Sequence, residues 1–143
     1  MTVGVPPVSG GGPALVDQSY VLGIAQGRNF TYQNGITATS GGTQAAAYQL
    51  KVGSSLIEVD TVAADGDSVK LFPALPGHEL VIANCGSHTL DIYASDGYNG
   101  ATLLSASDKI NNVANGTAYQ LTTFQTAQFM CAKAGVWQAI KTA

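Results

Sequence analysis

The sequence predicts an all-β protein, namely a single antiparallel β-sandwich or jelly-roll-like domain with an extended N-terminal arm. Three observations lead to this prediction. Hydrophobic residues alternate with a period of two along most of the chain, as they do in half-buried strands. Turn-forming dipeptides such as Asp65-Gly66 and Asn115-Gly116 separate these runs. The 143 residues suffice for one domain with a core of its own, but not for two.

Residues 1–18 differ in composition from the rest and predict the arm. The stretch from Val3 to Pro13 contains three prolines, a triple glycine and no charged residue. Proline lacks an amide donor and fixes φ, so this segment is a poor helix and a poor central strand. Its apolar side chains favour binding to a groove or sheet edge of a partner over the alternative of a disordered tail. The residues expected to make that contact are Val3, Val5, Pro6, Pro7, Val8 and Leu15.

Residues 19–143 form the predicted β-sandwich domain. Runs with β-strand patterning occur at 57–61, 68–71, 79–83, 90–94, 118–121, 127–129 and 136–140. Asn34-Gly35 is expected to be a turn, and Lys133-Ala134-Gly135 a three-residue hairpin with a left-handed glycine. Residues 44–51 combine helix-forming residues with strand-like alternation. We favour a strand there, since an isolated helix of that length is marginal.

Few residues are charged, at 10% against about 25% in ordinary soluble domains. The surface is therefore either neutral and polar or partly covered by other protein chains, because charged residues are depleted at interface cores. The net charge is −3 and the basic residues are scattered singly, which argues against a nucleic-acid partner. Neither a signal peptide nor a membrane span is predicted.

The sequence contains no catalytic motif, and we expect neither an enzyme nor a cofactor. His78, Cys85 and His88 lack the spacing of a zinc site. The acidic residues Glu58, Asp60, Asp65 and Asp67 could offer oxygens to calcium or act as a glycosidase pair, but they fit the polar face of a strand and a turn better. Cys85 and Cys131 are expected to be buried thiols, although a bridge between neighbouring strands stays open.

A longer pattern covers roughly residues 60–140. Its matching segments are 67–71 with Pro73, Pro76-Gly77, 80–84, Gly86, 90–93, Asp96-Gly97, Ile110-Asn111, 119–121, 129–132 and 134–137. The pattern resembles the β-domain of capsid decoration (cement) or head-fibre proteins of tailed bacteriophages. Ala94-Ser95 departs from it where a proline is associated with the pattern, a difference that affects a loop.

The resemblance implies a virion structural protein that is made in the host cytoplasm and added to the outside of the capsid. The implied partners are the major capsid protein and further copies of the chain, in a homotrimer. The candidate contacts between copies are Tyr93, Tyr119 and Phe129. The alternative is a head-fibre or tail-fibre receptor-binding module that contacts host-surface glycans through a loop at Tyr98.

Overall fold

The computed structural model describes residues 31–96 and 108–143, and within it Thr31–Ala143 is a compact unit. Every regular element of the described residues is a β-strand, so the all-β prediction is confirmed. The predicted arm boundary at residue 18 lies outside the described residues. The strands are β1 (Tyr32–Thr37), β2 (Tyr48–Gln49), β3 (Leu56–Thr61), β4 (Ser68–Lys70), β5 (Glu79–Asn84), β6 (Leu90–Tyr93), β7 (Lys109–Ile110), β8 (Tyr119–Leu121), β9 (Thr126–Lys133) and β10 (Val136–Lys141).

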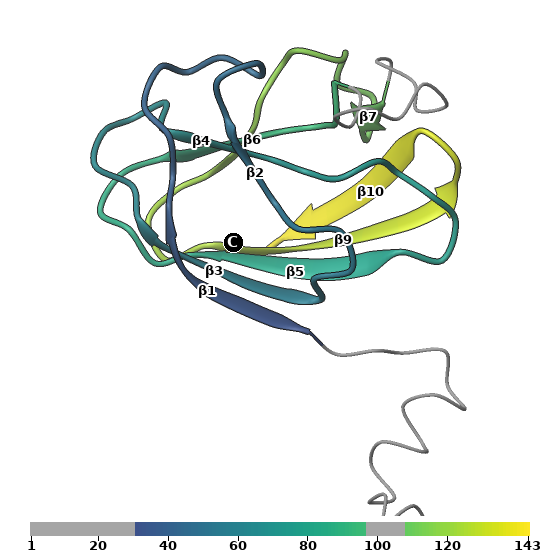
Figure 1. Cartoon of the computed structure of the whole chain (residues 1–143), viewed down its shortest axis with the longest axis horizontal. Helices are drawn as coiled ribbons and strands as arrows, with labels where there is room; N and C mark the ends of the chain where they lie inside the picture. Colours follow the sequence, from purple (N-terminus) through teal and green to yellow (C-terminus); the bar gives the residue numbers. More distant parts are fainter. Residues whose placement is uncertain (1–30, 97–107) are drawn as a thin grey trace, which may run out of the picture. The chain divides into compact units, whose positions relative to one another are not determined.

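The strands form two facing sheets (Figure 1). We call the six-stranded sheet, in the order β1-β3-β5-β9-β10-β7, sheet A, and the four-stranded sheet, in the order β2-β4-β6-β8, sheet B. From β1 to β9 the chain passes from one sheet to the other after every strand. Successive passes therefore lie beside each other as stacked coils, in the manner of a β-solenoid.

This connectivity corrects the predicted antiparallel jelly roll. β1, β3 and β5 are parallel neighbours, and so are β2, β4 and β6. Antiparallel pairs join β5 to β9, β9 to β10 and β6 to β8, where the chain reverses. The alternation of side chains is the same in both kinds of sheet, so it predicts strands without predicting their direction.

Alternate residues of both sheets face one core. Ile57, Leu80 and Phe129 come from sheet A, and they pack against residues of sheet B such as Ile92 and Leu121. These side chains are almost completely buried, and each contributes roughly 1.5–3 kcal/mol of transfer free energy. The core closes around Trp137, whose ring makes edge contacts with the rings of Phe72 and Phe129.

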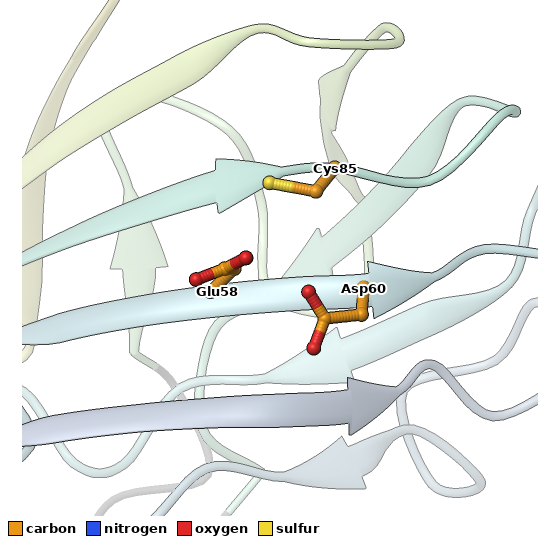
Figure 2. Close-up of side chains that lie close together, drawn as sticks. All are labelled: Glu58, Asp60 and Cys85. Carbon is orange, nitrogen blue, oxygen red and sulfur yellow. The ribbon is translucent and has the colours of Figure 1, made fainter.

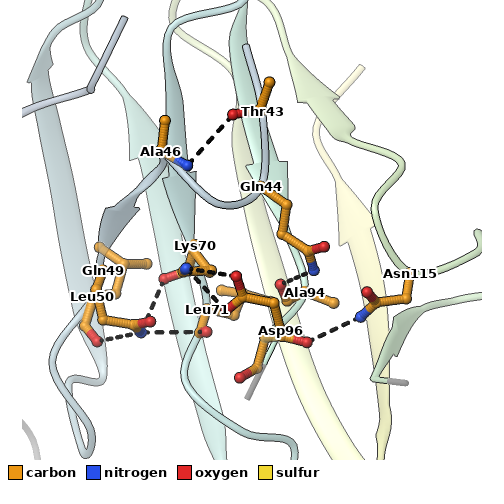
Figure 3. A network of polar contacts seen from close by, with 11 residues as sticks. Thr43, Gln44, Ala46, Gln49, Leu50, Lys70, Leu71, Ala94, Asp96 and Asn115 are labelled. Atoms are coloured by element: carbon orange, nitrogen blue, oxygen red, sulfur yellow. Dashed lines mark hydrogen bonds and ion pairs between the residues drawn. The ribbon is translucent and has the colours of Figure 1, made fainter. Parts of the chain in front are cut away.

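Polar contacts hold the long β1–β2 connection against sheet B (Figure 3). The side-chain amide of Gln44 donates to the Ala94 carbonyl at 2.8 Å, and the Tyr93 hydroxyl donates to the Gly42 carbonyl at 2.7 Å. The ion pair of the Lys70 ammonium with the Asp96 carboxylate, at 2.9 Å, links β4 to the segment that follows β6. The β1–β2 connection covers the outer side of β4 and β6, and the side chains of both strands are buried throughout.

Two local predictions were wrong. Asn34-Gly35 lies inside β1, where Gly35 has a φ of 68° and the pairing with β3 shifts register, as at a β-bulge. Residues 44–51 are neither a helix nor a full strand, because a turn precedes the two residues of β2. No helix long and apolar enough to cross a membrane is found at 31–96 or 108–143.

Candidate interaction surface

The outer face of sheet A is open to solvent, whereas that of sheet B is covered over its two central strands, β4 and β6. Buried and more exposed residues alternate along β3 and β5, and the side chains of β4 and β6 show no such alternation. Sheet A, which contains both parallel and antiparallel pairs, thus has one face on the core and one face available for contact. This open face is the best candidate for a functional surface in the described part of the chain.

A row of mostly apolar residues crosses this face at one level. Tyr32, Leu56, Val81, Gln128 and Ile140 are successive cross-strand partners from β1 to β10. Ile140 is 65% exposed, Tyr32 55% and Leu56 48%. Exposed apolar residues are ordinary when they occur singly, but a contiguous row is typical of a surface that binds a partner.

Phe124 adds a second exposed apolar group at one end of the same sheet. It lies in the turn between β8 and β9 with a φ of 61°, and its side chain is 79% exposed. Its amide donates to the Asn84 carbonyl at 2.9 Å, which attaches the turn to the end of β5. A bulky residue with positive φ is rare, and such strain concentrates at functional sites.

Two carboxylates and a thiol lie close together near this end of the face (Figure 2). Glu58 and Asp60 alternate on β3, and Cys85 directly follows β5. The ligand atoms of the three side chains all lie within 4.8 Å of one another. The Tyr32 hydroxyl, from β1, donates a hydrogen bond to the Glu58 carboxylate.

The electrostatics of this cluster favour a protonated thiol. Partial burial raises the pKa of Cys85, and the neighbouring negative charges of Glu58 and Asp60 raise it further. The hydrogen bond to the Glu58 carboxylate similarly raises the pKa of the Tyr32 phenol. Cys85 is therefore a poor nucleophile at neutral pH, and a divalent cation at these three residues would first have to displace its proton.

The structure separates the metal candidates that the sequence suggested. His88 Nδ1 lies 3.6 Å from Asp65, while the His78 ring stacks on Trp137 in the core. Asp65 and Asp67 organise the turn between β3 and β4: the Asp67 carboxylate accepts from the amides of Ala63 and Ala64, and Asp65 accepts from the Thr89 amide. Of the four predicted acidic residues, only Glu58 and Asp60 come together.

Two of the three predicted contacts between copies lie in the interior. Phe129 is completely buried, and Tyr93 is buried with its hydroxyl bonded to Gly42, so neither ring is available to another copy. The strand alternation identified them as facing residues without showing that the face was the core. Tyr119 is half-buried against the edge of the Phe129 ring, and its role at an interface stays a prediction.

The arm residues Val3, Val5, Pro6, Pro7, Val8 and Leu15 lie outside the described residues, and so does Tyr98. Both cysteines are free: Cys131 is buried as predicted, but Cys85 is exposed. The exposed apolar residues that the sequence analysis missed include Tyr32, Leu56, Phe124 and Ile140. The available signal for Phe124 was a large aromatic residue in the polar stretch 122–126, between two predicted strands.

No protein-family model matches the chain, and comparisons with curated proteins and with solved structures give no match either.

Proposed function

We propose that this protein is a capsid decoration (cement) protein, which binds the outside of a bacteriophage capsid and stabilises the shell. The observation that carries the proposal is the contrast between the two outer faces: β4 and β6 in the centre of sheet B are covered by the chain itself, whereas sheet A presents exposed apolar residues. An all-β domain with few charged residues and an open apolar face suits a protein that works by assembling with other chains.

The resemblance of residues 60–140 to decoration and head-fibre proteins directs the proposal to the virion. The protein would be made in the host cytoplasm and act on the capsid surface, with the major capsid protein and other copies of itself as partners. In this proposal it is a homotrimer and not an enzyme. Many weak contacts spread over a shell add up to strong attachment, because each further contact of a bound oligomer is intramolecular.

The test uses capsids that lack the protein. Purified chain is added to them, bound copies are located by electron microscopy, and the temperature at which the shells release their contents is measured. Binding to the outer surface with a higher release temperature is the expected result. Capsids that neither bind the protein nor gain stability would contradict the proposal. A loss of particle adsorption to cells, with unchanged shell stability, would instead favour a receptor-binding fibre module.

A further inference from the structure

The open face of sheet A has opposite charges at two separate corners. Glu58 and Asp60 lie near the carboxyl end of β3, and we call them the acidic corner. Lys109 and Lys133 flank Val136 as its cross-strand partners, on β7 and β9 respectively, and we call them the basic corner. Cross-strand partners point to the same side of a sheet. Because Trp137 and its partner Ile110 are buried in the core, Val136 and Lys109 lie on the open face. Lys133 pairs with Val136 beyond a register shift in the β9–β10 ladder, so it lies on the side of Val136 and does not continue the alternation of β9.

The register places the two corners far apart. β9 runs antiparallel to β5, and β5 runs parallel to β3, so the end of β9 at Lys133 is opposite to the end of β3 at Asp60. With about 3.3 Å per residue and about 4.8 Å between strands, the corners are on the order of 25 Å apart. They cannot neutralise each other within one molecule.

The surface between the corners carries little charge. Val81, Ala83, Met130 and Ile140 provide its apolar part, with the uncharged Gln128 between them. Glu79 is also on this face, at the start of β5, and it has interactions within the chain. The other described lysines point elsewhere: Lys51 is in the β2–β3 turn, Lys70 pairs with Asp96, and Lys141 donates to the Gln120 carbonyl.

We infer that a second copy of this chain docks on the open face of sheet A, with the acidic corner of one copy against the basic corner of the next. Such a contact brings together opposite charges that lie too far apart to interact within one molecule. It also buries the apolar residues between the two corners. The inference rests on the proposed function only in that it assigns the contact between copies in the oligomer. A homotrimer makes this contact at each of its interfaces when the acidic corner of each copy meets the basic corner of its neighbour around the ring.

Charge reversal in the full-length chain tests the contact. Glu58→Lys with Asp60→Lys gives a face with two basic corners, and Lys109→Glu with Lys133→Glu gives a face with two acidic corners. Each double variant should raise the dissociation constant of the oligomer about tenfold or more, as measured by sedimentation velocity, because close interfacial charge pairs are strongly coupled. The chain carrying all four reversals should associate nearly as well as the wild type, and Lys51→Glu serves as the control.

Salt and an apolar substitution provide independent readouts. Association should weaken between 0.1 and 1 M salt, as the Debye length falls from about 10 Å to about 3 Å. Ile140→Asp should weaken it further, whereas Val52→Asp, at an exposed position in the β2–β3 turn, should not.

A monomeric wild type, or double charge variants that associate as the wild type does, would overturn the inference. Failure of the four-fold reversal to restore association, with its fold intact by circular dichroism, would do the same. These outcomes are distinct from failure of the proposed function: a protein that shows the charge dependence but does not bind capsids contradicts decoration and supports the contact between copies.

Discussion

The backbone of Phe124 is in the left-handed region, and its aromatic side chain is 79% exposed to solvent. Phenylalanine has a large ring and a high propensity for β-strands, and neither property suits a φ of 61°. The turn is held by main-chain hydrogen bonds from Phe124 to Asn84 and from Gln125 to Thr122, which do not involve the aromatic side chain. An interaction role explains why an unfavourable residue occupies this position.

We therefore predict that Phe124→Asn stabilises the domain but weakens its assembly. Asparagine adopts the left-handed region more readily, so the free energy of unfolding should rise by roughly 0.5–1 kcal/mol. Urea denaturation measures this gain, and binding to capsids or to further copies measures the loss of the aromatic contact. Phe124→Tyr is the matched control and should change neither. A destabilised domain, or unimpaired assembly, would show that the residue has a structural role.

Asp108 is a buried carboxylate immediately before β7. Its oxygen accepts from the Ala74 amide at 2.8 Å, and its main-chain carbonyl accepts from the Asn115 side chain. Burial raises the pKa of Asp108 above the ordinary value of 3.8, and the hydrogen bond from Ala74 offsets only part of that effect. The folded protein therefore binds the proton of this group more tightly than the unfolded chain does.

The direction of the Asp108 pKa shift predicts how the free energy of unfolding changes with pH. As the pH rises from 3.8 through the higher pKa of the folded state, the unfolded chain releases the proton first, so the free energy of unfolding decreases. Asp108→Asn keeps an oxygen for the Ala74 amide and does not titrate. The stability of the wild type relative to this variant should fall over that pH interval and then stay constant. Parallel denaturation series of the two proteins test this, and a difference that rises with pH would refute the assignment.

At the scale of the elements, the corners of the stacked coils are close-packed. Gly86 lies in the connection from β5 to β6, and Val62 lies in the connection from β3 to β4. A Cβ atom at Gly86 would be only 2.6 Å from the amide nitrogen and the Cβ atom of Val62. The Gly86 amide donates to the side chain of buried Asn84, whose own amide donates to the carbonyls of His88 and Leu121. Two neighbouring coils thus meet where only glycine fits.

Gly86→Ala should accordingly destabilise the domain by about 1–3 kcal/mol, because the main chain at Val62 has to move. Thermal denaturation followed by circular dichroism measures the effect. Ser87→Ala, at the adjacent exposed position of the same connection, is the control and should change the stability by less than about 0.5 kcal/mol. Equal melting temperatures for both variants would mean that the coils are not packed at this corner.

The elements also show what the sequence could predict. The runs at 57–61, 68–71, 79–83 and 136–140 correspond to β3, β4, β5 and β10, because alternation reports directly on half-buried strands. Gly135 has a φ of 81°, as expected, although the β9–β10 turn contains two residues rather than three. β1 was missed because Asn34-Gly35 is also a turn signal, and the two-residue β7 is too short to show a period.

Which strands pair, and which of their side chains face the surface, cannot be predicted from the pattern of a single hydrophobic run. β3 and β5 are parallel neighbours because β4 between them crosses to the other sheet, and the pattern of a single run does not contain that relation. For the same reason Phe129 and Tyr93 were predicted at an interface between copies, although they face the core and the covered side of sheet B. The acidic cluster was recognised in part: Glu58 and Asp60 were visible as neighbours, and Cys85 joins them only through the β3–β5 pairing.

At the scale of the whole molecule, residues 31–143 contain a core that both sheets share. Trp137 of β10 packs with Phe72 and Phe129, so the C-terminal strands complete a core that begins with Ile36 of β1. The core residues of the described part of the chain run from Ile36 to Trp137, and they form one cluster that both sheets share. We therefore expect the domain to fold without residues 1–18.

The last prediction concerns that segment as the attachment arm. Val3, Val5, Val8 and Leu15 are apolar anchors, and Pro6 and Pro7 reduce the entropy that an extended chain loses when it is ordered on a partner. Deletion of residues 1–15 should leave a folded oligomer, with a melting temperature close to that of the full chain, that no longer binds capsids. Replacement of the same residues by a glycine-serine segment of equal length is the control for length alone, and it should fail to bind as well. If the truncated chain decorates capsids to full occupancy, the shell is bound by the β-domain, and the surfaces of that domain outside the contact between copies are then the ones to mutate.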